Sequence, residues 1–277
     1  MLDLDKAYRR RMAHGRGRSP RSGGGRARDP NVLLAAYLAS LGSVVKSWHD
    51  PTSDAYFTFS TGAQISAWVG RIGAQVLSQG TSANQPLRDL ATAVLGGKNT
   101  VKCDGSNDSL AAVANPNFWK FLHDGTGYAG YVVHRTDSTG NANQSLLYSA
   151  GAVAQVGIHI DMQAARVVES VFNGSGVAMN TWNLVTASHF ARDVSRYQMF
   201  GYTTGTQLSR VSGSSLTNAD TAGTPSAANP TTNLFVGNGN TAWKGYLGDL
   251  IFLSRTPTAG EHAQITSLLA QKWAVAA

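Results

Sequence analysis

Short runs of alternating apolar and polar residues occupy most of the chain after residue 48. In the run QVGIHID at 155–161, Val156, Ile158 and Ile160 point to one side, and the polar residues between them point to the other. Turn signals rich in Gly and Asn separate these runs, a pattern typical of an antiparallel sandwich or barrel. We therefore expect strands at 64–69, 128–135, 155–161, 165–171, 182–189, 196–203 and 246–254.

Two helices are predicted, one before the strands and one after them. Asp29 and Pro30 suit the N-cap and first position of a helix, and the apolar run that follows predicts a helix ending near Lys46. Because this helix is apolar almost all round, we expect both sides to be covered, by the domain alone or by the domain and a partner. Thr258 and Glu261 form a capping box that starts the second helix. Its expected buried face carries Ile265, Leu268, Leu269 and Trp273.

The composition indicates a globular domain rich in turns. Hydrophobic residues make up 42% of the 277 residues, enough to bury a sizeable core. Charged residues are only 14%, which favours β-structure and turns over helical bundles. No apolar run reaches the length of a membrane-spanning helix. The single cysteine, Cys103, excludes a disulfide within the chain and a clustered Cys/His zinc site.

Positive charge is concentrated at the N-terminus. Residues 1–29 hold nine basic and three acidic side chains, and the rest of the chain is nearly neutral. Since this arm is poor in apolar residues, we expect it to be disordered on its own, and it lacks the apolar stretch of a signal peptide. Arginine forks pair with carboxylates and phosphates, so the arm suits an anionic partner. The residues expected to anchor it are Arg9, Arg10, Arg11, Arg16, Arg18, Arg21, Arg26 and Arg28.

Four segments occur in the order found in a known superfamily. They are SVVKSWHDPTSDAYFTF at 43–59, LSQGTSANQPL at 77–87, TVKCDGSNDSL at 100–110, and the stretch from NLFVGNGN to LLAQKW at 233–273. With these segments the chain resembles the laminin-G-like branch of the concanavalin A-like lectin and glucanase superfamily, which recurs in bacterial surface proteins and bacteriophage virion proteins. Cys103 stands where that branch usually has Phe, and Asp249 where it has Glu.

The resemblance implies an all-β fold. We expect an antiparallel two-sheet jelly-roll sandwich of the concanavalin A type, with a short N-terminal helix, a C-terminal helix and an extended basic N-terminal arm. The expected units are the arm at 1–29, the apolar helix at 30–47 and the laminin-G-like domain at 48–277.

Catalysis is not expected from these residues. Glucanases of the superfamily carry a Glu-x-Asp-x-x-Glu motif, and glycoside hydrolysis needs two carboxylates about 5 to 9.5 Å apart. The two glutamates do not form such a pair, because Glu261 belongs to the capping box and Glu169 has no carboxylate partner on its strand. The nearest acidic pattern, His159-x-Asp161, contains no Glu. Cys103, at a core Phe position of the family, is expected to be an inert buried thiol.

Two kinds of binding site are candidates. No cofactor is expected except calcium, for which Asp104, Asn107 and Asp108 could give oxygen ligands; the alternative is an Asx-stabilised turn without a metal. Sandwiches of this type bind sugars through aromatic rings and Asn or Asp side chains, and the resemblance places such residues near the end loops. These glycan candidates are Asn238, Asn240, Trp243 and Tyr246.

Three functions follow from this combination. The preferred one is a non-enzymatic virion structural protein: a phage tail fibre, tail-associated or capsid-decorating protein, homo-oligomeric and assembled in the host cytoplasm. Its arm would bind other virion proteins, and its jelly roll would face outward toward host glycans. The alternative is a carbohydrate-binding module or adhesin of a bacterial surface. The third is an internal capsid protein whose arm binds nucleic acid, which is less favoured because the charge of the arm is modest.

Overall fold

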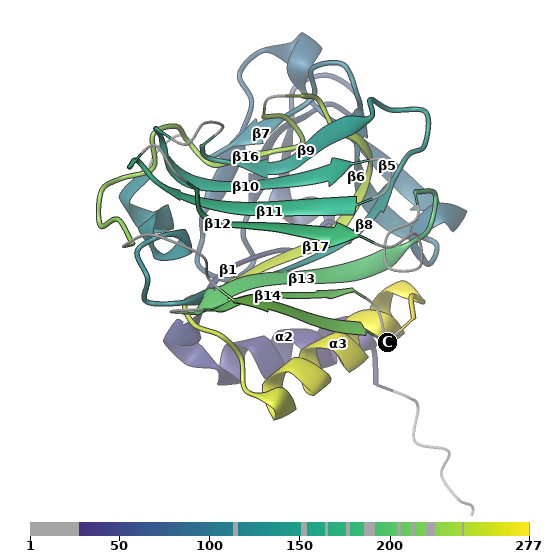
Figure 1. Cartoon of the computed structure of the whole chain (residues 1–277). Coiled ribbons are helices and arrows are strands. Elements are labelled where there is room, and N and C mark those ends of the chain that lie inside the picture. Colours follow the sequence, from purple (N-terminus) through teal and green to yellow (C-terminus); the bar gives the residue numbers. More distant parts are fainter. Residues whose placement is uncertain are drawn as a thin grey trace, which may run out of the picture.

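The computed structural model describes residues 28–112, 116–150, 154–163, 166–175, 178–185, 192–203, 206–211, 214–219, 225–239 and 241–276. Two α-helices flank the strands in sequence, and they are α2 (Pro30–Ser40) and α3 (Ala259–Trp273). They contact each other and lie beneath the strands in Figure 1. Within the described residues, no helix has the length and apolar character needed to cross a bilayer.

The strands form two antiparallel sheets. Sheet A contains, in spatial order, β15 (Ser214–Ala219), β14 (Thr206–Val211), β13 (Arg196–Thr203), β8 (Tyr128–Thr136), β17 (Lys244–Leu253), β6 (Lys98–Asp104) and β5 (Leu87–Thr92), with β1 (Val45–His49) beside β17. Along one edge of β17, Lys244–Leu247 pairs with β6, and Leu250–Leu253 pairs with β1. The register of β17 against β8 shifts between Leu247 and Leu250, so Gly248 and Asp249 lie where one edge partner gives way to the next.

Sheet B lies on the other side of sheet A from the helices (Figure 1). It contains, in spatial order, β12 (Ala178–Val185), β11 (Arg166–Asn173), β10 (Val156–Gln163), β9 (Asn143–Tyr148), β16 (Phe235–Val236), β7 (Leu110–Ala111), β4 (Val76–Ser78), β3 (Ile65–Val69) and β2 (Phe57–Phe59). Short 3-10 helices in the connections are η1 (Gly42–Val44), η2 (Asp54–Tyr56), η3 (Ser82–Asn84), η4 (Ala93–Leu95) and η5 (Pro116–Leu122).

Sheet A is apolar on both faces because it is the middle of three layers. Its inner face, with Val132 and Phe252, packs against Ile158 and Ile160 of sheet B. Its outer face, including Ile251, packs against the two helices. This explains the unbroken apolar run at 250–253, since a strand covered on both sides has no polar face.

The fold confirms the predicted two-sheet jelly-roll sandwich, and each predicted strand range overlaps a strand. The least accurate range is 182–189, since β12 ends at Val185 and residues 186–191 lie outside the described part. At α3, the Thr258 hydroxyl accepts a hydrogen bond from the backbone N–H of Glu261, and the Glu261 carboxylate accepts one from the N–H of Thr258, as the capping box predicts. The expected inner residues of α3 are all buried: Ile265, Leu268, Leu269 and Trp273.

The first helix begins as predicted but ends earlier. Asp29 caps it by accepting from the N–H of Asn31 at 2.9 Å. The prediction of an end near Lys46 is wrong, because α2 stops at Ser40, Gly42 adopts a left-handed φ of +59°, and Val45 already pairs with Leu253. The expected boundary between residues 47 and 48 therefore falls inside β1.

The outer side of α2 is not fully covered. Val32 is 58% exposed, whereas Leu34 and Leu38 on the opposite side of the helix are buried. The alternative in which the domain alone covers both sides of this helix is therefore wrong, and coverage of its outer side by a partner stays a prediction.

Candidate functional site

The outer face of sheet B carries a mixed group of polar and aromatic side chains. We call this group the outer cluster, and its members come from β9, β10 and β16. The strand register places them in adjacent pairs, with Tyr148 opposite both His159 and Phe235. The outer cluster consists of Ser145, Tyr148, His159, Asp161 and Phe235.

A β-bulge in β9 assembles the outer cluster. Leu147 lies opposite Ile160, but Ser145 lies opposite Asp161, so Leu146 is an extra residue in β9. The extra residue reverses the alternation, and both leucines therefore point into the core. As a result Tyr148 emerges on the same outer face as Ser145.

The polar members of the outer cluster are in direct contact. The Ser145 hydroxyl donates to Asp161 Oδ1 at 2.8 Å, and His159 Nε2 lies 3.1 Å from Ser145 Oγ and 2.7 Å from Asp161 Oδ1. A catalytic Ser-His-Asp relay needs one imidazole nitrogen on the serine and the other on the carboxylate. Here one nitrogen faces both partners and the serine proton points to the aspartate, so the geometry does not suit activation of Ser145 as a nucleophile.

Two half-buried aromatic rings flank these polar groups. Tyr148 meets the His159 ring edge-on at 5.3 Å, and its ring centroid lies 6.4 Å from that of Phe235. The loop that contains Gly239 lies against Tyr148: a Cβ atom added to Gly239 would lie 2.6 Å from the Cβ atom of Tyr148. This close approach brings Asn238 next to the outer cluster.

The structure separates the predicted glycan residues instead of gathering them. Asn238 is half-buried beside the outer cluster, and Asn240 lies outside the described residues. Tyr246 is half-buried on the outer face of sheet A, with Lys102 Nζ 5.5 Å from its ring centroid. The prediction that Trp243 contacts a sugar is wrong. Its side chain is fully buried between the sheets and its indole N–H donates to Thr136 Oγ1 at 3.2 Å, so neither ring face can stack on a sugar.

The calcium candidates form a hydrogen-bonded turn. Asp104 Oδ1 accepts from the N–H of Ser106 at 2.7 Å, and Asp108 Oδ2 accepts from the N–H of Asp104 at 2.8 Å. The Asn107 amide donates to Asn84 Oδ1 at 2.9 Å. Among the described residues, no group of three or more His, Cys, Asp or Glu side chains is placed to hold a metal ion. Calcium binding at this turn stays a prediction.

The remaining reactive candidates are held in structural roles. Glu169 is fully buried and accepts from the Tyr128 hydroxyl at 3.1 Å, and Glu261 pairs with Arg255 at 2.6 Å. Burial raises the pKa of the Cys103 thiol well above its usual range, which suits the predicted inert thiol.

Of the anchoring residues, Arg28 is exposed. The others lie outside the described part: Arg9, Arg10, Arg11, Arg16, Arg18, Arg21 and Arg26.

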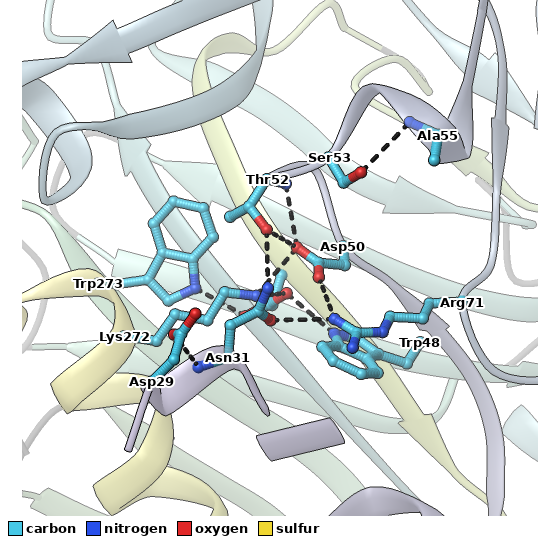
Figure 2. A network of polar contacts seen from close by, with 11 residues as sticks. Asp29, Asn31, Trp48, Asp50, Thr52, Ser53, Ala55, Arg71, Lys272 and Trp273 are labelled. Atoms are coloured by element: carbon cyan, nitrogen blue, oxygen red, sulfur yellow. Dashed lines mark hydrogen bonds and ion pairs between the residues drawn. The ribbon is translucent and has the colours of Figure 1, made fainter. Parts of the chain in front are cut away.

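A second polar group lies between sheet A and the helices, and we call it the helix–sheet network (Figure 2). Lys272 of α3 is fully buried and contacts Asp249 Oδ1 at 2.8 Å and Asp50 Oδ1 at 3.0 Å. The indoles of Trp48 and Trp273 donate to the two oxygens of Asp249 at 2.9 and 2.7 Å. These contacts fasten the last turn of α3 to sheet A.

The charges of the helix–sheet network balance. Arg71 donates to Asp50 Oδ2 at 2.8 Å, so two carboxylates face two cations. Burial raises the pKa of Asp249, and Lys272 opposes the rise. Burial also acts to raise the pKa of Asp50, but Lys272 and Thr52 more than offset it, so that pKa is lowered. Every carboxylate oxygen of Asp50 and Asp249 has a donor, as a structural network requires.

Comparison with known proteins shows the fold but no sequence family. Neither a protein-family model nor a curated protein matches the sequence. Among solved structures, the Trypanosoma rangeli sialidase in complex with sialic acid has a similar fold. The alignment covers 87% of this chain and 37% of the sialidase chain, with 11% sequence identity and a TM-score of 0.55. The botulinum neurotoxin serotype D binding domain matches 85% of this chain and 53% of its own, at 8% identity and a TM-score of 0.54.

A third match has the same character. The receptor-binding domain of the botulinum neurotoxin C/D mosaic serotype matches 82% of this chain and 51% of its own, at 7% identity and a TM-score of 0.50. In each case this chain spans less than two thirds of the other protein's length. At such low identities the likeness concerns the fold alone, which is a lectin-like jelly roll of two antiparallel sheets.

Proposed function

We propose that this chain is a non-catalytic carbohydrate-binding domain, and that the outer cluster on sheet B contacts the sugar. The observation that carries the proposal is the pairing of half-buried Tyr148 and Phe235 rings with the polar side chains of His159 and Asp161 on one sheet face. Proteins that contain a similar fold include a sialidase solved with sialic acid and toxin domains named as binding or receptor-binding domains.

The chemistry of the outer cluster suits a sugar. An aromatic ring packs against the apolar C–H face of a pyranose, and the carboxylate of Asp161 accepts from hydroxyl groups. Asn238, on the adjoining loop, offers both a donor and an acceptor. We expect low affinity per site, which several copies on one particle or cell would offset.

A glycan array with a multimerised domain tests this proposal. We expect binding to a defined subset of glycans, a loss of about tenfold or more for Tyr148→Ala, and a clear loss for Asp161→Ala. The matched control is Tyr246→Ala, which removes a half-buried tyrosine from the opposite side of the molecule and should leave binding unchanged. A silent array with folded, multimeric protein overturns the function. Loss with Tyr246→Ala but not with Tyr148→Ala overturns the site.

We also propose a second role, in which the basic arm attaches the domain to a phage particle as a homo-oligomeric structural component. The supporting observation is the concentration of nine basic residues within residues 1–29. Deleting residues 1–27 should abolish incorporation into particles while the domain still folds. Particles that keep a full complement of the truncated protein would contradict this role, and strongly salt-dependent binding of the isolated chain to DNA would favour an internal, nucleic-acid-bound position.

A further inference from the structure

One kind of turn recurs in the described part of the chain. The side-chain Oδ1 of an aspartate or asparagine accepts two hydrogen bonds from the residue two positions later, one from its backbone N–H and one from its hydroxyl. In most of these turns the acceptor is a carboxylate, which suits two donors because of its charge. The carboxylates are Asp50, Asp124 and Asp137, and the remaining acceptor is the neutral amide of Asn173.

The amide carbon of Asn173 is made electrophilic by its hydrogen bonds. The backbone N–H of Ser175 donates to Asn173 Oδ1 at 3.0 Å, and the Ser175 hydroxyl donates to the same oxygen at 2.6 Å. Two donors on one carbonyl oxygen stabilise the negative charge that this oxygen gains when a nucleophile adds to its carbon. Unlike a carboxylate, the amide also has a nitrogen that can leave as ammonia.

A nucleophile is built into the same turn. A bond between the backbone nitrogen of Gly174 and Cγ of Asn173 closes a five-membered ring, so the attack is intramolecular. Gly174 has no side chain to shield this nitrogen, and its φ of +81° is a conformation that favours glycine. The turn follows β11 directly. Asn173 is half-buried, and Gly174 and Ser175 are exposed, so water reaches the site.

We propose that Asn173 is a site of spontaneous deamidation in the folded protein. The Gly174 nitrogen gives up its proton and bonds to Cγ of Asn173, the bond from Cγ to Nδ2 breaks, and ammonia leaves with that proton. A water molecule then opens the succinimide ring at either of its two carbonyl carbons. The product at residue 173 is aspartate or isoaspartate. Overall an amide and water become a carboxylate and an ammonium ion, and the protein gains one negative charge.

The turn at Asp124 has the same geometry without the reactive group. Asp124 is followed by Gly125, and its Oδ1 accepts from the N–H and the hydroxyl of Thr126 at 2.9 and 2.6 Å. Its negative charge opposes attack by a nucleophile, and it has no ammonia to release. The comparison shows that the chemistry of residue 173, and not the turn alone, makes the site reactive.

Asn238 has the reactive group without the geometry. It is also followed by a glycine, but a Cβ atom added to Gly239 would lie 2.6 Å from Tyr148, so this backbone is packed against a side chain. Asn238 also forms a β-bridge with Ala242. Ring closure would have to move this backbone, so we expect Asn238 to react more slowly than Asn173.

Peptide mapping of the full chain tests the proposal. The protein is incubated at neutral pH in water enriched in heavy oxygen, and its peptides are analysed by mass spectrometry at intervals. We expect the peptide with residue 173 to take up one heavy oxygen atom and to contain both aspartate and isoaspartate, since only the ring gives the second product. The peptide with Asn238 should react at least about tenfold more slowly. An unmodified Asn173, or a reaction at Asn238 that is as fast, overturns the proposal.

A pair of variants tests the role of the hydrogen bonds. Ser175→Ala removes the hydroxyl donor at an exposed position and keeps the backbone N–H, so the reaction at Asn173 should become about fivefold slower. The matched control is Thr126→Ala, which removes the same hydroxyl from the turn at Asp124 and should leave the rate at Asn173 unchanged. If Ser175→Ala reacts as fast as the wild type, the turn does not promote the reaction and the mechanism fails.

Discussion

Two sets of buried polar side chains lie on opposite faces of sheet A: the helix–sheet network on the outer face, and His134, Gln198 and Ser209 on the inner face. In the network, Lys272, Asp50 and Asp249 complete one another, and the indoles of Trp48 and Trp273 supply further donors. On the inner face, a hydrogen bond from the Gln198 side chain raises the pKa of His134 against the effect of burial, and Ser209 Oγ has no hydrogen-bond partner among the described residues. The polar atoms of the network are paired, whereas those of the inner-face residues are paired only in part.

The difference shows how a buried polar group can be interpreted from its hydrogen bonds. A complete set of partners indicates a structural fastening whose loss exposes an unpaired charge. An incomplete set lowers the stability of the fold, because a buried polar group without a partner keeps its full desolvation penalty. The experiments below separate these two cases.

The largest effect is expected from Asp249→Leu. This substitution removes two acceptors from the indole N–H groups of Trp48 and Trp273 and one of the two partners of Lys272. We expect the free energy of unfolding to fall by about 3 to 5 kcal/mol, measured by urea denaturation. Asp193→Asn, at an exposed carboxylate 3.5 Å from Arg135, is the control: it removes the charge, suits the left-handed backbone of residue 193 and keeps the Oδ1 acceptor for the N–H of Ser138, so it should change the free energy of unfolding by less than about 1 kcal/mol. Equal effects of the two substitutions would refute a structural role for the network.

The next effect concerns pH and the neutral His134. Its pKa is lowered to about 3 by burial, so the unfolded chain, with an ordinary histidine pKa of 6.5, binds the proton first. The free energy of unfolding should therefore fall as the pH drops below 6.5 and continue to fall toward pH 3, by up to about 1.4 kcal/mol per pH unit. His134→Gln should remove this part of the slope, measured as the difference from wild type between pH 6.5 and 5. Parallel slopes for the two proteins would show that His134 does not titrate in this way.

A smaller effect of opposite sign is expected at Asp108. Burial, with a smaller contribution from Asp104, raises its pKa to about 6, so the folded state loses stability as the pH rises from 3.8 through 6. Asp108→Asn keeps an acceptor for the N–H of Asp104 and removes the charge. We expect a gain of about 1 kcal/mol at pH 7.5 and none at pH 4, measured by thermal unfolding. If calcium stabilises the wild type but not this variant, the turn at 104–108 is a calcium site, and the Asx-turn alternative fails.

The smallest effect is expected from Thr100→Val. The Thr100 hydroxyl is buried and has no hydrogen-bond partner among the described residues. A single unpaired hydroxyl that holds no water should be slightly destabilising, so its replacement by a methyl group should raise the free energy of unfolding by about 0.5 to 1 kcal/mol. A clear loss of stability would show that the Thr100 hydroxyl has a hydrogen-bond partner in the folded protein.

The sequence was most informative where one periodicity extends over a whole element. Alternation in QVGIHID placed Ile158 and Ile160 in the core and set His159 on the outer face, and the capping box located the start of α3. The end of α2 was missed because an apolar run does not distinguish a helix from a buried strand. The left-handed conformation of Gly42 and the pairing of Val45 with Leu253 determine where the helix ends and the strand begins.

The candidate site was predicted only in part, for a specific physical reason. His159 and Asp161 could be assigned to one face from their spacing, but Ser145 and Tyr148 are three residues apart and strict alternation puts them on opposite faces. Only the extra residue Leu146 brings them together, and a bulge of this kind leaves no mark in a pattern of period two. Trp243 was misplaced because an aromatic residue next to a loop is as consistent with core packing as with stacking.

The pairing of β1 with β17 has a consequence for how the chain folds. The Trp48 indole is hydrogen-bonded to Asp249, 201 positions later, and the Asp50 carboxylate to Lys272, 222 positions later. During synthesis β1 therefore cannot pair with β17 until almost every other strand has been made, and its apolar residues stay uncovered during that time. Contacts of such long sequence separation slow folding and lengthen the time during which the chain can aggregate. We expect this protein to fold slowly and to depend on chaperones in proportion to the time that its first strand stays unpaired.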